Sequence, residues 1–325
     1  MRIEVKRSDS KRVLIIDALN MFLRSYTIIP SMNPKGLPNG GTIGFLKSLQ
    51  KLCRDFRPNE IVICWDGHGG SEKRRQINKE YKQGRRPVRF NRRMIELPEN
   101  EVKKNRADQQ IRLHEYLNEM PVVQLMLDYI EADDVIAYVN SMKRYKGWDK
   151  IIVSSDKDFY QLCANDETMI WRPIQKELIN RAILVNKFGV HPSNFALVRA
   201  IEGDSSDNLK GVPRVGMKTM VKYFPFLENE KKLSCDDILT HCSMEKSKKA
   251  VHNKLLEHKE LLKTNYKIMQ LYDPNISYQG REEIRFKVNN HNPLLNKMNV
   301  AKMLIEDGQG SLNLSDLWAA FKRVV

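Results

Sequence analysis

Three short runs of apolar, largely β-branched residues stand out along the chain, and an aspartate follows each of them. A run of this length and composition predicts a buried strand rather than a helix. The runs and their acids are Val13 to Ile16 with Asp17, Ile61 to Trp65 with Asp66, and Ile151 to Val153 with Asp156.

Apolar positions at helical spacing separate these runs. Residues Ala18 to Tyr26 predict a short helix, and a longer amphipathic helix is predicted with Thr42 as its N-cap and its end before Pro58. Strands that alternate with helices indicate an α/β fold with a mostly parallel, twisted sheet flanked by helices. The carboxyl ends of parallel strands lie at one edge of such a sheet, where ligands bind. We therefore expect the strand-end aspartates to gather at that edge.

The stretch from Tyr129 to Leu162 holds the densest group of acids. Glu131 and Asp134 are three residues apart and share one face of a predicted helix. Asp156 and Asp158 would point the same way on an extended backbone. Such carboxylates repel one another unless cations bind, and oxygen ligands suit Mg²⁺ or Mn²⁺. A solvated acidic surface is the alternative. The full acid set is Asp17, Asp66, Glu131, Asp133, Asp134, Asp156, Asp158, Asp204 and Asp207.

Residues 71–118 differ in composition from the rest of the chain, because basic side chains come almost back to back and apolar ones are sparse before Leu113. A solvated helical face or a disordered loop is one interpretation. The other is a mobile, helix-forming insertion, broken at Pro87 and Pro98, that grips phosphates near the acidic site.

The second half of the chain is predicted to be mainly helical. We expect an α/β core over residues 1–180 and a helical region over 181–325. The individual predictions are an edge strand at Met169 to Arg172 paired with Glu177 to Ile179, helices at Ala182 to Phe188 and Pro192 to Ile201, a long amphipathic helix from Met244 to Gln270, a strand at Ile284 to Val288, and short helices near 300–306 and 315–323.

Composition points to a polyanionic partner. The chain has 325 residues, of which 41% are hydrophobic, and a formal net charge of +15. A globular protein this basic is expected to bind nucleic acid. The cysteines form no Cys-x-x-Cys pair, and the spacing of Cys235, His241 and Cys242 matches no zinc pattern. There is no apolar run long enough to span a membrane and no signal peptide at the charged start, so we expect a cytoplasmic protein without a membrane partner.

The segment from Gly211 to Thr219 resembles a phosphate-binding P-loop only in part, because Met217 separates the second glycine from Lys218 and Pro213 lacks an amide. We interpret residues 203–224 as a helix–hairpin–helix motif. Its turn would present Gly211, Gly216, Lys218 and Thr219 to a DNA phosphate. A purely structural turn is the alternative.

Six motifs, taken in order, resemble the 5′-nuclease superfamily, which includes flap endonucleases, the 5′-nuclease domain of bacterial DNA polymerase I and phage RNase H-type 5′-3′ exonucleases. The resemblance covers roughly residues 13–224. Its motifs are Asp17-Ala-Leu-Asn20, Tyr81-Lys-Gln-Gly-Arg85, Glu131-Ala-Asp-Asp134, Ser155-Asp-Lys-Asp158, Gly203-Asp-Ser-Ser-Asp207 and the hairpin Gly211 to Thr219.

The resemblance implies a Mg²⁺-dependent 5′-3′ exonuclease and structure-specific flap endonuclease that removes RNA primers and flaps. Asp17, Asp66, Glu131, Asp133 and Asp134 would serve one metal ion, and Asp156, Asp158, Asp204 and Asp207 a second. Residues 71–118 would form a helical arch over the 5′ single strand. Lys82 and Arg85 would act on the scissile phosphate together with the shared ligand Asp156. Tyr81 would stack on a base, Arg24 and Arg86 would contact DNA, and K⁺ would bind near 211–216.

The resemblance also implies a monomer that meets DNA with a 5′ flap, a nick or an RNA primer, with a single-strand binding protein or sliding clamp as further partners. Ala18, Arg214 and Met217 depart from the family pattern, where Gly, a small residue and Pro are usual. Two other functions stay open: a single-strand RNA nuclease of the related PIN class, and a non-catalytic binder of branched DNA.

Overall fold

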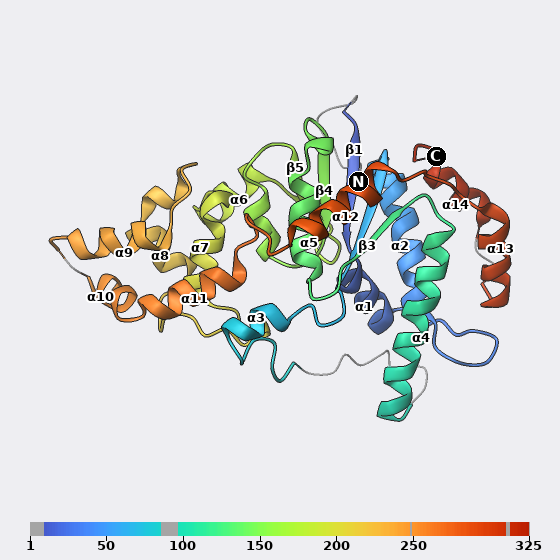
Figure 1. Cartoon of the computed structure of the whole chain (residues 1–325), viewed down its shortest axis with the longest axis horizontal. Coiled ribbons are helices and arrows are strands. Elements are labelled where there is room, and N and C mark those ends of the chain that lie inside the picture. Colours follow the sequence, from blue (N-terminus) through green and yellow to red (C-terminus); the bar gives the residue numbers. More distant parts are fainter. Residues whose placement is uncertain (1–9, 86–96, 248, 310–312, 325) are drawn as a thin grey trace.

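The computed structural model describes residues 10–85, 97–247, 249–309 and 313–324. Its centre is a six-stranded sheet in the order β3-β2-β1-β4-β5-β6 (Figure 1). The first five strands in this order pair in parallel and β6 pairs with β5 in antiparallel fashion, which confirms the predicted α/β class. The strands are β1 Arg12–Asp17, β2 Glu60–Trp65, β3 Val123–Met126, β4 Asp149–Val153, β5 Thr168–Arg172 and β6 Glu177–Ile179.

One strand prediction needs correction. Met169 to Arg172 is not an edge strand, since β5 pairs with β4 on one side and with β6 on the other. The three-residue β6 is the edge. The two strands do pair across a turn, as the sequence predicted.

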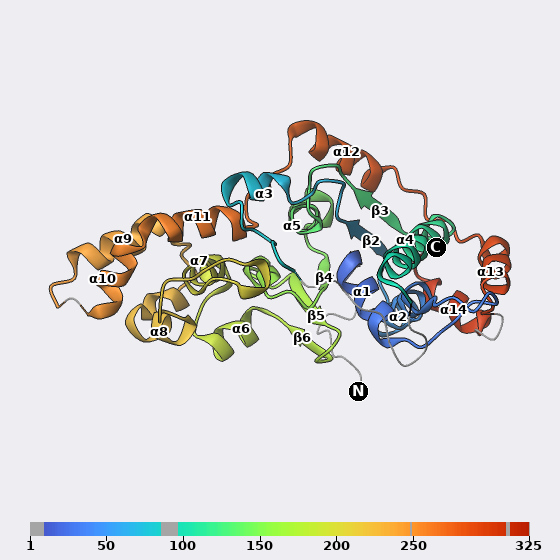
Figure 2. The same cartoon turned by 90° about the horizontal axis from the view of Figure 1, so that it is seen from below.

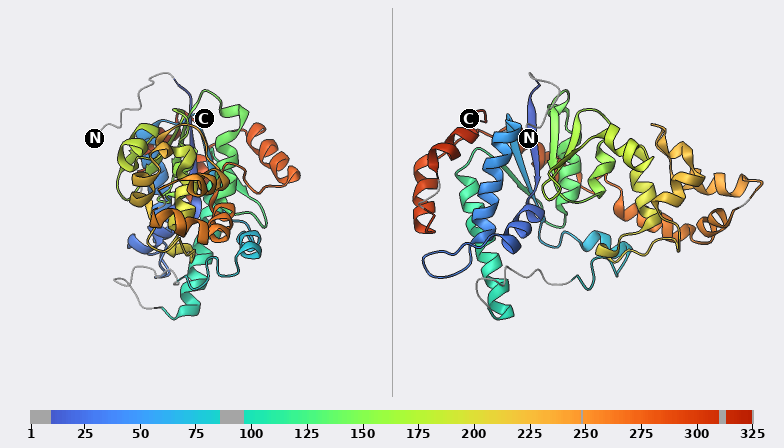
Figure 3. Two further views of the ribbon diagram at one scale, coloured as in Figure 1. Left: turned by 90° about the vertical axis from the view of Figure 1, so that its left-hand side faces the viewer. Right: turned by 180° about the vertical axis from the view of Figure 1, so that it is seen from behind.

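Helices cover both faces of the sheet (Figure 2). On one face, Leu14 and Ile16 of β1 pack in the same apolar cluster as Val300 and Phe321 near the end of the chain. Figure 3 shows α14 beside α2. The helices on this face are α1 Ala18–Ile28, α2 Gly40–Phe56, α4 Glu99–Asn118, α13 Lys297–Glu306 and α14 Leu314–Phe321.

The opposite face of the sheet carries α5 Ala132–Ser141 and leads into a helical extension that forms the other end of the molecule (Figure 1). The further elements are α3 Glu72–Ile77, η1 Lys143–Tyr145, η2 Asp158–Leu162, α6 Arg181–Phe188, α7 Pro192–Glu202, η3 Ser205–Asp207, α8 Met217–Tyr223, η4 Pro225–Glu228, α9 Cys235–Met244, α10 Ala250–Glu257, α11 Lys259–Met269 and α12 Tyr278–Asn289, where η marks a 3₁₀ turn.

Thr42 is not the N-cap of α2. The helix begins at Gly40 with Asn39 as the cap residue. A Cβ at Gly40 would lie 2.0 Å from the carbonyl oxygen of Ile29, so this close approach accepts only glycine at the first turn. Thr42 lies inside the helix, where its hydroxyl donates to the Gln109 carbonyl at 2.8 Å.

The predicted long helix from Met244 to Gln270 is wrong. The chain leaves helical geometry after Met244, and α10 and α11 meet at His258, whose φ of −107° interrupts the helix. The break lets the apolar side chains of both short helices become buried, including Val251 and Leu262.

The strand predicted at Ile284 to Val288 is also wrong, because these residues belong to α12. Ile284 and Val288 are both buried and lie one helical turn apart, while residues 285–287 between them are exposed. Ser277 caps the helix by accepting the Gly280 amide at 3.2 Å. The helical spacing of the buried residues therefore determines the secondary structure of this segment, despite its β-branched residues.

Candidate active site

The predicted acids meet at the carboxyl edge of the sheet. Asp17 is the last residue of β1, Asp66 follows β2, Glu131 precedes α5 and Asp156 lies just beyond β4. These positions come from neighbouring parallel strands and from the helix that follows β3, so the fold itself brings the side chains together.

Asp17 is held by two donors on neighbouring elements. The Ser154 hydroxyl donates to one carboxylate oxygen at 2.8 Å and the Asn20 amide donates to the other at 3.1 Å. Burial raises the pKa of Asp17 to about 7, and the nearby charges of Asp66 and Asp156 act in the same direction. The acids thus repel one another across the sheet edge.

Asp66 fixes the start of α5 from a different strand. Its Oδ1 accepts the backbone amide of Ala132 at 2.9 Å. This amide is one of the free donors at a helix start, and Glu131, the N-cap residue, makes no side-chain cap of its own. The side chain of Glu131 is thereby left for other contacts.

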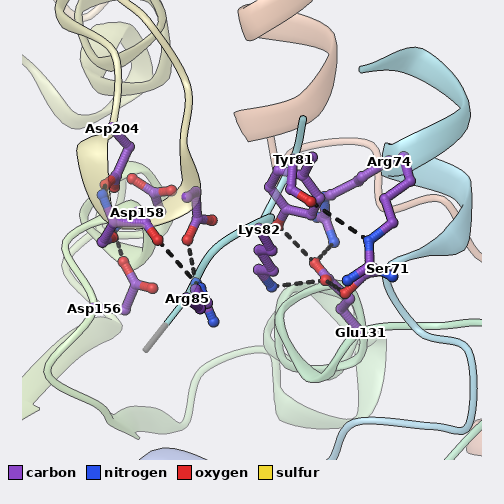
Figure 4. Close-up of polar contacts among 12 residues, drawn as sticks. Ser71, Arg74, Tyr81, Lys82, Arg85, Glu131, Asp156, Asp158 and Asp204 are labelled. Atoms are coloured by element: carbon purple, nitrogen blue, oxygen red, sulfur yellow. Dashed lines mark hydrogen bonds and ion pairs between the residues drawn. The ribbon is translucent and has the colours of Figure 1, made fainter. Parts of the chain in front are cut away.

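Glu131 is 2% exposed and accepts four side-chain donors (Figure 4). Burial alone would raise its pKa, but Arg74 and Lys82 lower it to about 2. Glu131 is therefore a buried carboxylate kept charged by its partners. The donors are Ser71 Oγ at 2.6 Å, Lys82 Nζ at 2.7 Å, the Tyr81 hydroxyl at 3.0 Å and an Arg74 Nη1 in direct contact.

Arg74 joins three parts of the molecule. Its Nη1 also lies 3.0 Å from Asp134 Oδ2, and its Nε donates to the Ile268 carbonyl at the end of α11 at 3.0 Å. Asp134 in turn accepts the Asn275 amide at 3.1 Å. Glu131 and Asp134 do share one side of the helix, as predicted, and both face this arginine.

Asp133 and Asp156 are also repelled by the acids around them. Burial raises the pKa of Asp133 well above its usual value, and Asp156 and Glu131 raise it further against the opposing effect of Lys82. Burial also raises the pKa of Asp156, with Asp207 and Asp204 adding to the rise. These shifts place both groups of acids within electrostatic reach of each other.

The backbone does not stay extended between Asp156 and Asp158, which corrects the sequence prediction. Asp158 begins η2, and its amide donates to Asp156 Oδ1 at 2.8 Å. Arg199 of α7 then bonds Asp158 through Nε at 3.0 Å and Asp204 through Nη2. Burial raises the pKa of Asp158 to about 7 and Asp156 adds to it, although Arg199 opposes the rise.

The base of the predicted arch is tied to the loop after α7. The Lys82 amide donates to the Asp207 carbonyl at 2.9 Å, and the guanidinium of Arg85 contacts the Asp207 carboxylate. Lys82 has a φ of +56°, a left-handed conformation that costs a non-glycine residue energy and is most frequent at functional sites. In Figure 4, Lys82 and Arg85 lie between the group around Glu131 and that around Asp158.

Basic side chains therefore separate the carboxylates. Within the described ranges, no three acidic, histidine or cysteine side chains converge closely enough to form a ready-made metal site. The donor set nevertheless fits a divalent cation, because it is made of oxygens and because Asp17, Asp133, Asp156 and Asp158 all have raised pKa values that such a cation would relieve.

A cavity of about 830 Å³ opens beside these acids. It extends from the end of β4 to the turn that follows α7, so it joins the carboxylates to the predicted hairpin. Its lining includes Asn20, Asp156, Arg199, Asp204, Lys210 and Gly211.

The hairpin packs tightly on the end of α7. A Cβ at Gly211 would lie 2.0 Å from the Glu202 carbonyl oxygen, which explains the glycine. Arg214 and Lys218 are exposed, and Arg214 has a φ of +62°. Lys254 of α10 donates to the Pro213 carbonyl at 3.1 Å.

The remaining predicted DNA contacts differ in their exposure to solvent. Tyr81 is 3% exposed, with its hydroxyl on Glu131, so its ring is not available for stacking in this conformation. Arg24 is half-buried on α1, with Gly216 and Thr219 half-buried on the hairpin. Arg86 lies outside the described residues. The stacking and DNA contacts stay predictions.

Sequence reasoning missed Arg199, Ser71 and Ser154 and treated Arg74 only as one cation in a basic run. Arg199 lies 41 residues from Asp158, and Arg74 lies 57 residues from Glu131. No local spacing could have paired them. Among the described residues, none of the helices has the length and hydropathy that crossing a bilayer requires.

The chain also matches proteins of known family. Residues 12–189 match the family of the 5′-3′ exonuclease, N-terminal resolvase-like domain. A 5′-3′ exonuclease of Aquifex aeolicus is 28% identical over 294 residues, covering 90% of this chain and 93% of the relative. The flap endonuclease Xni of Shewanella baltica is 30% identical over 260 residues, covering 80% and 89%.

Among solved structures, a bacteriophage T5 flap endonuclease in complex with DNA and metal ions has the same fold, with a TM-score of 0.63 and 18% identity over 92% of this chain and 100% of that one. The extent of the family match and the identity to Xni together establish that this chain belongs to the 5′-3′ exonuclease family of nucleases.

Proposed function

We propose that the protein is a Mg²⁺-dependent 5′-3′ exonuclease and structure-specific flap endonuclease. It acts on branched or nicked duplex DNA and on RNA/DNA hybrids, and removes RNA primers and 5′ flaps during replication. The observation that carries this proposal is the meeting of carboxylates from β1, β2, β4 and α5 at one sheet edge, beside an 830 Å³ cavity that reaches the hairpin.

Two sets of acids would hold the divalent cations. Bound ions would lower the pKa of the attacking water and stabilise the leaving oxygen of the phosphodiester. Mn²⁺ has the same preference for oxygen ligands and would substitute. The first set is Asp17, Asp66, Glu131, Asp133 and Asp134, and the second is Asp156, Asp158, Asp204 and Asp207.

The chain's own cations supply the electrostatic part of the reaction. Lys82 and Arg85 contact Glu131 and Asp207, the acids nearest the arch base. Both side chains end in flexible donors, so a phosphate at the site would compete for them with the carboxylates. There they would stabilise the charge that develops on the phosphoryl oxygens.

Duplex DNA would lie along the hairpin and the arch would accept the 5′ single strand. The net charge of +15 and the exposed Lys218 and Arg214 support this placement. K⁺ near residues 211–216 would add a further link to a phosphate. In this proposal residues 1–180 are the nuclease core, residues 181–325 the DNA-binding region, and the protein acts as a cytoplasmic monomer that meets a single-strand binding protein or sliding clamp.

The test is a cleavage assay on a 5′-labelled flap duplex with Mg²⁺. We expect a short labelled product at the junction, none with EDTA, and none from Asp156→Asn, which should still bind the flap. A single-stranded RNA of the same length tests the PIN-type ribonuclease. Cleavage of that RNA in preference to the flap, or binding of the flap with no Mg²⁺-dependent product, would reject the proposal.

A further inference from the structure

A second cavity, of about 560 Å³, lies between α2 and α14. Its floor includes the buried Cys53 and the small side chains of Ala319 and Ala320. Its other lining residues are Gln50, Arg54, Arg57, Asp316, Lys322 and Arg323. Arg54, Arg57, Lys322 and Arg323 are exposed, so the cavity is an open groove with an apolar floor and a cationic rim.

The groove lies at the edge of the sheet opposite the acids. Arg12, at the start of β1, donates from Nη1 to the carbonyl of Phe56 at 3.1 Å, which fixes the end of α2 at the amino ends of the strands. The predicted metal ligands follow the carboxyl ends of the same strands. The length of β1 therefore separates the groove from the edge that carries these acids. DNA bound at that acidic edge would not need the groove.

Among the described residues, few acids lie close to the cations of the rim. In the part of the lining that the structure describes, Asp316 is the one acid, against four cations. Asp55 lies beside the rim, but its contact with Arg54 is long, at 3.8 Å. The ends of α2 and α14 thus bring several like charges together over an apolar surface, an arrangement that a ligand carrying negative charge would stabilise.

We propose that this groove binds an acidic segment of a partner protein that also carries apolar side chains. The four cations would pair with Asp or Glu side chains of the segment. The apolar surface formed by Cys53, Ala319 and Ala320 would take an apolar side chain of the segment. Electrostatic attraction of this kind raises the association rate and fixes orientation.

The experiment uses the full-length protein and a fluorescein-labelled peptide of alternating Asp and Leu residues, with fluorescence anisotropy as the readout. We expect wild type to bind this peptide and to ignore a peptide in which Ser replaces Asp. Arg54→Glu combined with Arg323→Glu should weaken binding by about tenfold or more, equivalent to about 1.4 kcal/mol. Arg54→Gln with Arg323→Gln should give a smaller loss and serves if the charge reversal perturbs folding.

Lys146→Glu is the matched control, because Lys146 is exposed just before β4 at the same edge of the sheet but outside the groove. It should leave peptide binding unchanged. Equal binding of both peptides, or an equal loss with Lys146→Glu, would refute the groove as an acidic-peptide site. A selective loss of flap-DNA affinity in the groove variants would refute it too, because the groove would then be a nucleic-acid surface. Flap cleavage by the groove variants should match wild type, which keeps this outcome separate from the proposed activity.

Discussion

Arg199 holds Asp158 in place: its Nε donates to the carboxylate at 3.0 Å, from a helix that lies 41 residues further along the chain. The same guanidinium contacts Asp204, so it fixes the relative positions of two acids that we propose bind one metal ion. We regard Arg199 as a positioning residue.

Arg199→Met should raise the Mn²⁺ concentration needed for half-maximal cleavage by about tenfold, as is typical when a partner of a metal ligand is lost. Mn²⁺ titrated without DNA, followed by calorimetry, should show the same weakening. Arg199→Lys keeps a donor and should recover part of it. An unchanged Mn²⁺ requirement in Arg199→Met would show that the arginine has only a structural role.

Tyr81 supports Glu131 in the structure, whereas the family resemblance gives it a stacking role. Tyr81→Phe separates the two, because it keeps the ring and removes the hydroxyl. If the hydrogen bond to Glu131 matters, cleavage should slow by about fivefold, which corresponds to about 1 kcal/mol for one hydrogen bond. Flap affinity should not change.

Tyr81→Leu is the companion variant, since it removes both the ring and the hydroxyl. A Phe variant with full activity and a Leu variant with weakened flap binding would favour stacking over support of Glu131. Single-turnover cleavage and anisotropy measure the two effects separately.

Arg214 adopts a φ of +62° on the exposed hairpin, where an L residue is strained and glycine is not. Arg214→Gly should therefore raise the free energy of unfolding by up to about 1 kcal/mol, after the entropic cost of glycine. The same change should weaken binding to duplex DNA. The slope of log affinity against log salt concentration should fall by the amount that corresponds to about one phosphate contact.

Arg214→Lys is the control for Arg214→Gly, because it keeps the charge and the strain. Denaturant unfolding and anisotropy at several salt concentrations give the two readouts. A glycine variant that binds duplex DNA as tightly as wild type at every salt concentration would remove Arg214 from the interface.

Arg74 is buried between Glu131 and Asp134. Arg74→Met would leave both carboxylates without their shared counter-ion and free the Ile268 carbonyl. Breaking a buried pair in this way costs about 3–5 kcal/mol, so the midpoint of urea unfolding should fall sharply. Lys73→Met, at a half-buried neighbour whose ammonium donates to the Asn275 carbonyl at 3.0 Å, should cost only about 0.5–1.5 kcal/mol. Similar unfolding curves for the two variants would contradict this account.

The elements that the sequence predicted well are those whose signal is local. The runs before Asp17, Asp66 and Asp156 became β1, β2 and β4, and their order in a parallel sheet placed the three acids at one edge. This follows because the side-chain pattern that marks a strand is contained in a short segment. Parallel pairing then places the carboxyl ends of neighbouring strands at the same edge of the sheet.

The errors arose where a distant contact overrides a local preference. Thr42 is a good N-cap residue, but the approach of Gly40 to Ile29 starts the helix earlier. The segment around Ile284 holds β-branched residues, yet its packing against the region of β3 selects a helix. Propensity differences of under about 1 kcal/mol per residue cannot resist such packing.

The sequence by itself determined which acids, which run of basic residues and which glycine-rich segment the chain carries, since these depend on residue type and order alone. Only the tertiary structure decided which cation faces which acid: Arg74 and Lys82 on Glu131, and Arg199 on Asp158. The physical reason is that a charge interacts through a few ångströms of space, and separation along the chain carries almost no information about that distance.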